Sequence, residues 1–184
     1  MATRDAPLSS PRHDGRLPQQ LRTWSLEPAP FGAAAGRVLV RAGRTTVLCA
    51  ASIDDDVPPW LAGQDKGWVT AEYEMWPGSV APRRRRGRSG KIDGRTTEIQ
   101  RLIGRSLRAA VDLNKLGPRL VTVDCDVLEA DGGTRTAAIT GGYVALVQAI
   151  QTVEPFASGQ PLPVTDSIAA VSVGLVDGQA VLDL

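Results

Sequence analysis

The residues best suited to chemistry lie in the run DCDVLEADGGTRTAA at positions 124–138. A glycine pair lets the backbone approach a ligand closely, and the free N–H groups at a helix start attract anions. Thr134 offers a hydroxyl or a helix cap, and Arg135 offers a forked cation that suits phosphate oxygens. We therefore predict that Gly133, Thr134 and Arg135 bind phosphate. The alternative is a capped strand-to-helix turn whose arginine pairs with a nearby carboxylate.

A second arginine stands at the start of another expected helix. The apolar residues of positions 96–113 recur at helical spacing, Thr96 is a suitable N-cap, and Arg95 directly precedes it. If the fold brings the two helix starts together, Arg95 and Arg135 bind one anion from two sides. Two unrelated surface arginines are the alternative.

The elements that position these residues follow from the alternation of apolar and polar side chains. Strands are expected at 22–26, 36–41, 45–53, 67–76 and 120–128, and helices at 96–113 and 136–151. The apolar run at 47–51 indicates a strand covered on both faces, and positions 168–175 and 180–184 indicate a hairpin. Glycines inside the second helix cost stability, which indicates that this helix approaches its neighbours closely.

Positions 77–94 form the most basic part of the chain, with the arginines Arg83, Arg84, Arg85, Arg86 and Arg88. Their like charges repel one another, and the segment has little apolar surface to bury. We predict that these arginines bind a nucleic-acid backbone with an affinity that depends on salt concentration and not on base sequence. A solvated loop without a partner is the alternative.

Other groups suited to acid–base or metal chemistry have simpler interpretations. The single histidine, His13, lies near the N-terminus and is expected at the surface. The three adjacent aspartates at 54–56 are expected in a solvated turn. Asp124 and Asp126 share a strand face and could bind a metal, although polar strand faces often carry carboxylates. The sequence therefore leaves the metal unknown.

Length and composition are those of one globular domain. The chain has 184 residues, of which 42% are hydrophobic and 22% charged, which is ordinary for such proteins. We expect a flexible leader at 1–11 and a domain at 12–184. Cys49 and Cys125 lie in apolar strands, which indicates buried, reduced thiols. No apolar run suits a membrane span or a signal peptide, so we expect a cytoplasmic protein without a membrane partner.

Several longer motifs resemble those of the ribonuclease PH family. The matching runs are RHDGR at 12–16, KGWVTAEY at 66–73, GRTTEIQRLIGRSLRA at 94–109, DCDVLEADGGTRTAAITG at 124–141, and positions 169–184. The resemblance covers nearly the whole chain from Arg12 onward. The pair of motifs around Arg95 and Arg135 is far more specific than a glycine turn alone.

The resemblance implies a fold and an activity. The family fold is α/β, with βαβ units and helices packed on mixed sheets, and it is shared with a ribosomal-protein domain. Family members form hexameric rings and trim the 3′ ends of tRNA precursors, with inorganic phosphate as co-substrate and Mg²⁺ expected. They release nucleoside diphosphates. The resemblance also assigns phosphate binding to Arg95, Gly133, Thr134 and Arg135.

The resemblance also implies differences from the family. Family chains continue past Leu184 into an acidic segment that carries metal-binding aspartates. We therefore expect an incomplete C-terminal part, no certain catalytic carboxylate and weakened phosphorolysis. The basic loop departs from the usual family sequence, so its RNA contacts cannot be transferred one by one. The alternatives are a non-catalytic RNA-binding or ring-scaffold subunit, or a fragment destabilised by exposed sheet edges.

Overall fold

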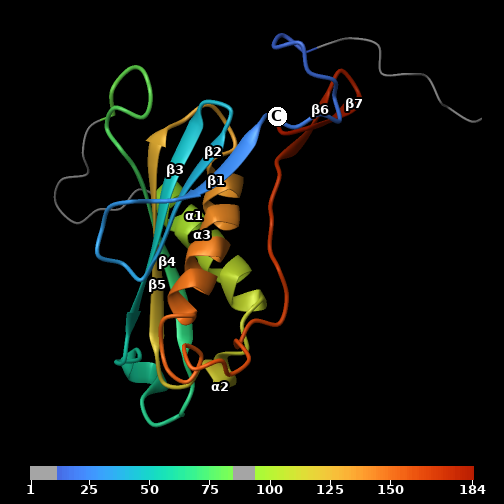
Figure 1. Ribbon diagram of the computed structural model, residues 1–184. Helices are drawn as coiled ribbons and strands as arrows, with labels where there is room; N and C mark the ends of the chain where they lie inside the picture. The colour runs from blue at the N-terminus through green and yellow to red at the C-terminus, as the bar shows by residue number, and fades with distance from the viewer. Residues whose placement is uncertain (1–11, 85–93) are drawn as a thin grey trace, which may run out of the picture.

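The computed structural model describes residues 12–84 and 94–184 and contains a five-stranded mixed sheet (Figure 1). The spatial order of its strands is β1-β2-β3-β5-β4. Their bounds are β1 Trp24–Pro28, β2 Gly36–Ala42, β3 Thr45–Asp54, β4 Trp68–Met75 and β5 Leu120–Glu129. The four neighbour pairs are antiparallel except β4 and β5, which run parallel. The predicted α/β fold is confirmed.

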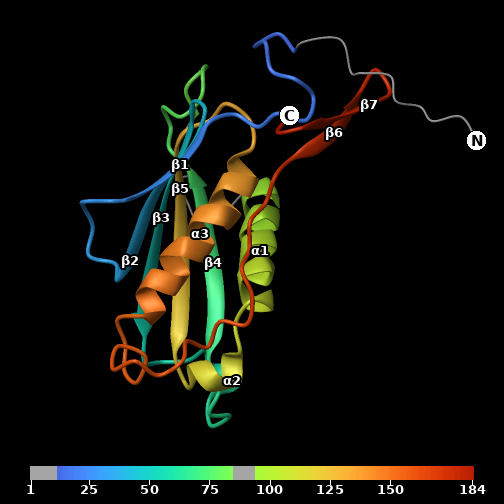
Figure 2. The same cartoon turned by 45° about the vertical axis from the view of Figure 1, so that its right-hand side comes forward.

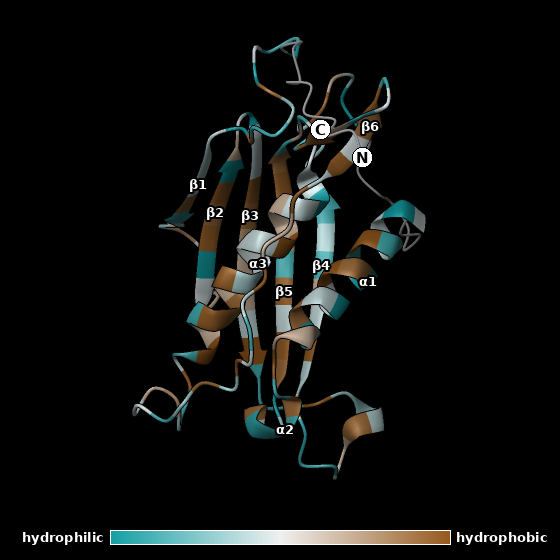
Figure 3. Ribbon diagram, turned by 90° about the vertical axis from the view of Figure 1, so that its right-hand side faces the viewer, coloured by the Kyte–Doolittle hydropathy of each residue, from teal (hydrophilic) through white to brown (hydrophobic). Residues whose placement is uncertain are grey.

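The parallel strands β4 and β5 belong to one βαβ unit. They are joined by α1 (Gly94–Ala109) and the short α2 (Leu113–Leu116), and α3 (Thr134–Ile150) follows β5. The two long helices lie side by side on the same face of the sheet (Figures 2 and 3). Because β4 and β5 run in the same direction, both strands end at the edge where α1 and α3 begin (Figure 2).

The core lies between the sheet and the two long helices. Val123 on β5 and Leu107 on α1 are fully buried there, as are both cysteines, which are free thiols. Gly141 on α3 sits against β2, since an added Cβ would lie 2.1 Å from Val40 Cγ2. The close approach predicted from the small residues of this helix is confirmed.

The opposite face of the sheet corrects the prediction for positions 47–51. Leu48 and Ala50 on that face are only half-buried, whereas Val47 and Cys49 on the helix side are fully buried. Both long helices lie on the other face, and among the described residues no helix or second sheet covers this one (Figures 1 and 2). The sequence is continuously apolar at 47–51 because Leu48 and Ala50, on the half-buried face, are apolar as well.

Several predicted boundaries were also wrong. The helix expected at 96–113 ends at Ala109, because Asp112 caps α2 through bonds from the N–H groups of Asn114 and Lys115. The Asp112 N–H also bonds Pro163 O, which turns the chain away from α1. The helix expected from position 136 begins two residues earlier, at Thr134.

A small hairpin of β6 (Val173–Val176) and β7 (Gln179–Leu182) lies beyond one end of the large sheet (Figure 1). The strand expected at 168–175 is shorter, since residues 168–172 are extended without a paired strand. Residues 12–22, the N-terminal segment, bind the hairpin. Leu182 N donates to Pro18 O at 2.8 Å, and Arg12 Nη1 donates to Leu182 O at 2.8 Å. In the described part of the chain, no helix has the length and apolar character to cross a membrane.

Candidate anion-binding site

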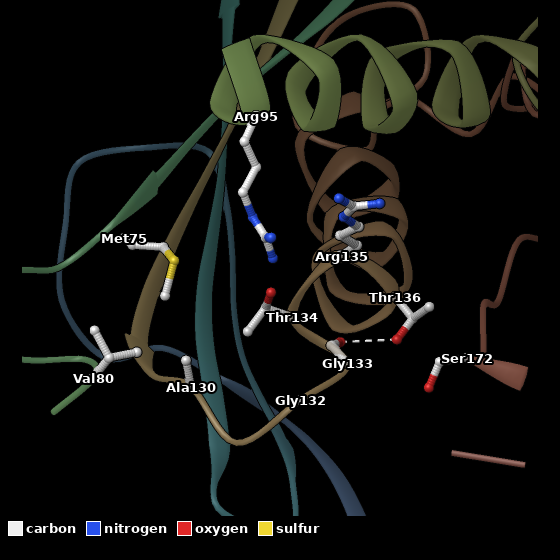
Figure 4. A pocket seen from close by; sticks show the side chains of 10 residues that line it. All are labelled: Met75, Val80, Arg95, Ala130, Gly132, Gly133, Thr134, Arg135, Thr136 and Ser172. Carbon is white, nitrogen blue, oxygen red and sulfur yellow. Dashed lines mark hydrogen bonds between the residues drawn. The ribbon is translucent and has the colours of Figure 1, made fainter. Parts of the chain in front are cut away.

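A pocket of about 400 Å³ opens where β4 and β5 end (Figure 4). It contains all four residues that the sequence analysis assigned to phosphate. The residues that line it are Met75, Val80, Arg95, Ala130, Gly132, Gly133, Thr134, Arg135, Thr136 and Ser172. The fold does bring the two helix starts together at one pocket, whereas phosphate binding by these residues stays a prediction.

The glycine pair builds the floor of this pocket. Gly133 is the N-cap of α3 with φ +67°, a left-handed conformation that glycine adopts without strain. A Cβ there would lie 2.8 Å from Arg22 Nη2, so a larger residue would push this guanidinium group away from Asp183. Thr136 Oγ1 donates to Gly133 O at 2.8 Å. Gly133 makes no side-chain cap bond, so the first N–H groups of α3 remain available for a ligand, as at any helix start.

Arg95 and Arg135 reach the pocket from different helices. Arg95 lies in the first turn of α1 and Arg135 in the first turn of α3. In Figure 4 the Arg95 side chain extends toward Thr134, and Arg135 stands beside it on the neighbouring helix. Two guanidinium groups and a helix N-terminus at one pocket create a strongly positive site for an oxyanion.

Arg135 also has a carboxylate partner, as the alternative interpretation expected. Its Nη2 lies 3.1 Å from Glu98 Oε2 on α1. The two side chains are 41% and 52% exposed, and exposed ion pairs are weak. The pair links the two helix starts, and an anion can compete with Glu98 for the guanidinium group.

Tyr73 is a polar contact of the site that sequence reasoning missed. Its hydroxyl donates to Thr134 Oγ1 at 2.9 Å, and its side chain is 2% exposed. Burial raises the pKa of Tyr73, so the phenol stays protonated at neutral pH and keeps donating. Tyr73 follows Val69 and Ala71 on the core side of β4. Tyr73 is the one polar side chain among these core-side positions, and this could have marked it as a candidate site residue.

Asp183 is a second missed group beside the glycine pair. Its carboxylate is 1% exposed and receives Arg22 Nη2 at 2.7 Å and Arg16 Nη1 at 3.2 Å. The bond from Arg22 lowers the pKa of Asp183. Arg22 also donates to the backbone oxygens of Asp131 and Gly132. This cluster ties the hairpin and the N-terminal segment to the pocket floor.

The remaining candidates lie elsewhere or cannot be placed. Arg83 is exposed, whereas the Arg84 side chain reaches Met75 Sδ at 3.0 Å, at the rim of the pocket. Arg85, Arg86 and Arg88 lie outside the described residues. His13 and the aspartates at 54–56 are exposed.

The acidic residues of the open sheet face do not form a metal site. Asp124 and Asp126 lie there beside Glu72 and Glu74 of the parallel strand β4. Burial, followed by the charge of the neighbouring Asp126, raises the pKa of Asp124. Across residues 12–84 and 94–184, no group of three or more Asp, Glu, His or Cys side chains is arranged to hold a metal ion. The described residues therefore do not fit the metal that the family resemblance implies.

Known sequences match this chain over almost its whole length. The model of the 3′ exoribonuclease family, domain 1, matches residues 20–150. A ribonuclease PH of Rhodopirellula baltica is 56% identical over 178 residues, which cover 94% of this chain and 70% of the relative. A ribonuclease PH of Synechococcus sp. (strain CC9605) is 51% identical over 177 residues, with 95% and 71% covered.

Solved structures of related assemblies share the fold. The Archaeoglobus fulgidus exosome with RNA bound to the active site gives a TM-score of 0.76 at 27% identity, with 94% of this chain and 70% of that chain covered. The crystal structure of rice Rrp46 gives a TM-score of 0.73 at 24% identity, covering 94% of this chain and 72% of that one. The likeness to the rice protein concerns the fold alone.

Proposed function

Because the chain belongs to the ribonuclease PH family of phosphorolytic 3′ exoribonucleases, we propose that the pocket binds inorganic phosphate beside an RNA 3′ end. The observation that carries this assignment is the convergence of Arg95 and Arg135 on one pocket with Gly133 and Thr134. A pocket with two arginines and a helix start suits a doubly charged oxyanion.

Phosphorolysis asks the protein mainly for positioning and charge neutralisation. A phosphate oxygen attacks the phosphorus of the last phosphodiester, and the bond from that phosphorus to the 3′ oxygen of the preceding nucleotide breaks. The terminal nucleotide leaves as a nucleoside diphosphate, and the shortened RNA takes a proton on its new 3′ hydroxyl. Arg95 and Arg135 offset the repulsion between phosphate and RNA, and Thr134 fixes the orientation of the nucleophile.

The RNA partner follows from the family and from the basic segment. We propose that Arg83, Arg84, Arg85, Arg86 and Arg88 hold the RNA backbone, that the substrates are 3′ ends of tRNA precursors, and that the subunits form a hexameric ring in the cytoplasm. The contact of Arg84 with Met75 supports this, because it brings the start of the basic segment to the pocket rim. Among the described residues, no group of three or more acidic, histidine or cysteine side chains is arranged to hold a metal, so the arginines are the groups that offset the charge of phosphate and RNA.

The non-catalytic alternative has weaker support. Likeness to exosome structures rests on 26–27% identity, whereas the two relatives named ribonuclease PH are 51–56% identical. A scaffold subunit has no need for a hydroxyl and two arginines around one pocket. The phosphorolytic enzyme is therefore the better-supported of the two functions.

The proposal is tested by titrating inorganic phosphate into the parent chain, Arg95→Ala and Arg135→Ala by calorimetry. Each variant is expected to bind phosphate at least about tenfold more weakly, since each loses a charge-assisted contact of roughly 1.5–3 kcal/mol. Arg41→Ala, an exposed arginine on β2, is the control and should bind like the parent. Phosphate-dependent release of nucleoside diphosphate from RNA is measured in parallel. Unchanged phosphate affinity in both pocket variants contradicts the assignment.

A further inference from the structure

The N-terminal segment lies beside the hairpin of β6 and β7 (Figures 1 and 2), and a second pocket of about 440 Å³ opens between them. A volume of this size lies in the range of pockets that bind small organic ligands. This hairpin pocket shares no lining residue with the proposed phosphate pocket. The phosphorolytic chemistry proposed above therefore makes no use of it.

The N-terminal segment supplies the positive charge of the hairpin pocket. Arg12 lines the pocket, and its Nη1 and Nη2 donate at 2.8 Å to Leu182 O and Asp183 O. Because a guanidinium group carries five N–H groups, these two bonds hold it in place and leave donors for a ligand. Arg16 and Arg22 pair with Asp183, but no carboxylate of the described residues lies within ion-pair distance of Arg12. Arg12 is therefore a fixed cation that an anionic ligand can neutralise.

The hairpin supplies the apolar side of the same pocket. Val176 and Leu184 line it and are 46% and 53% exposed, so both have apolar area left for a ligand. Gln179 adds an amide that donates and accepts, and the exposed His13 adds a ring donor from the N-terminal segment. Asp177, in the hairpin turn, is the acidic residue of the lining. The pocket therefore suits a ligand that combines an anionic group with a flat or apolar body.

A single backbone pairing separates the hairpin pocket from the phosphate pocket. Leu184 lines the first of these pockets and Ser172 lines the second. Leu184 N donates to Ser172 Oγ at 3.2 Å, and Asp183 N donates to Ser172 O at 2.7 Å. The two pockets are therefore neighbours. Because the phosphate pocket is proposed to hold an RNA 3′ end, the anionic ligand with a flat body that such a neighbour brings is a nucleotide.

We propose that the hairpin pocket binds a phosphorylated nucleoside, with the phosphate on Arg12 and His13 and the base against Val176 and Leu184. The forked guanidinium group suits phosphate oxygens, and the apolar side chains suit the face of a base. Two sources share this chemistry: a free nucleotide, and an internal nucleotide of the RNA whose 3′ end lies in the phosphate pocket. The RNA source rests on the proposed function, whereas the free nucleotide does not depend on it.

Nuclear magnetic resonance titrations of the whole chain test the proposal and distinguish the two sources. The amide signals of Val176 and Gln179 report on the hairpin pocket. The probes are adenosine monophosphate and a five-nucleotide oligoadenylate, both added without inorganic phosphate so that no phosphorolysis occurs. Saturable shifts of these signals with adenosine monophosphate identify a free nucleotide as the ligand, and shifts with the RNA alone identify an internal nucleotide. Hairpin signals that respond to neither probe overturn the proposal.

Failure of the proposed function is visible separately in the same spectra. The amide signals of Gly133 and Thr134 report on the phosphate pocket. If they do not respond to inorganic phosphate, the phosphate assignment fails, whatever the hairpin signals show with the two nucleotide probes.

Two matched pairs of variants show whether the hairpin pocket itself binds the probe. Val176→Glu removes apolar contact and places a carboxylate beside the phosphate, so binding should weaken by about tenfold or more. Val173→Glu is its control, because Val173 lies on the same strand, is exposed and does not line the pocket. Asp177→Asn removes a repelling charge and should tighten binding by about two- to fivefold, whereas Asp54→Asn, on the exposed end of β3, should change nothing.

Thermal melts show that each variant is folded before its affinity is compared. Asparagine tolerates the positive φ of position 177, and both valines are exposed, so the four substitutions fall where the fold accepts them. Equal affinities in the two glutamate variants overturn the hairpin pocket as the binding site.

Discussion

Thr134 carries the neutral hydroxyl that the proposed site uses, and Tyr73 determines its direction. Because Thr134 Oγ1 accepts the bond from Tyr73, the hydrogen of Thr134 is free to point toward an anion. Tyr73→Phe should weaken phosphate binding by about 1 kcal/mol, the usual value of one hydrogen bond. Tyr143→Phe is the matched control, since that hydroxyl bonds Asp166 O away from the pocket. Phosphate titration of both variants measures the difference; an equal loss in the two refutes this role.

Glu98 competes with phosphate for Arg135. Replacing Glu98 by glutamine removes a negative charge 3.1 Å from the guanidinium group, so phosphate should bind more tightly. The gain is expected to be at most about 1 kcal/mol, because the pair is exposed. Glu129→Gln breaks a comparable exposed pair with Arg44 and serves as control. The same phosphate titration measures the change, and weaker binding in Glu98→Gln shows that the carboxylate helps hold the site together.

At the residue scale, the sequence predicted the groups that follow from local chemistry. It indicated the glycine pair, Thr134 and both arginines, which line one pocket, because helix starts and guanidinium groups attract anions wherever they occur. Tyr73 and Asp183 were missed for a different reason. Each acts through a partner far away in sequence: Thr134 is 61 residues from Tyr73, and Arg22 is 161 residues from Asp183. Only the folded chain brings such pairs together.

At the scale of elements, α3 depends on glycine to approach the sheet. A Cβ on Gly141 would meet Val40 Cγ2 at 2.1 Å and Cys49 Sγ at 2.9 Å, whereas one on Gly142 would meet Val123 Cγ1 at 3.4 Å. Gly141→Ala should therefore destabilise the fold by roughly 1–3 kcal/mol through overpacking. Gly142→Ala should be neutral or stabilising by up to about 1 kcal/mol, because alanine favours the helix.

Denaturant unfolding of these two neighbouring variants gives a direct comparison. The substitution is chemically the same and the helix is the same, so only the facing surface differs. Equal stability changes in the two variants contradict the packing of α3 against β2. Phosphate affinity of each folded variant shows whether a shift of α3 reaches the pocket at its N-terminus.

The helix boundaries show where pattern reading fails. The apolar stripe of α1 continues to Val111, which is buried although it lies outside the helix. Val111 instead forms a bridge with Val164. The spacing of apolar residues predicts that a side chain is buried, but it does not show whether that residue belongs to a helix. The cap at Asp112, a local signal, was the information that placed the true boundary.

At the scale of the molecule, the N-terminal segment and the C-terminal hairpin meet on one buried carboxylate. Arg16 and Arg22 come from the first segment, and Asp183 follows β7. Because Arg22 also bonds the oxygens of Asp131 and Gly132, the pocket floor shares this anchor. Global stability and the shape of the pocket floor are therefore linked through Asp183.

The pH dependence of stability tests that link. The pKa of Asp183 is lowered in the folded chain, so its contribution is complete above the unfolded value of about 3.9 and disappears as pH falls through the lower folded value. Asp183→Asn should cost roughly 1.5–3 kcal/mol at pH 7, as for hydrogen bonds to a charged group. The difference from the parent should shrink in acid.

Asp124→Asn provides a control of opposite sign for the same measurement. Burial, followed by the charge of Asp126, raises the pKa of the half-buried Asp124, so the folded chain holds its proton more tightly than the unfolded chain, and stability is lost as pH rises above about 3.9. This variant should therefore be more stable than the parent at pH 7 and equal to it in acid. Chemical denaturation of both variants from pH 3 to 8 measures the two differences. An Asp183→Asn variant as stable as the parent at pH 7 contradicts the Asp183 anchor, whereas a control variant less stable than the parent contradicts only the raised pKa of its own carboxyl.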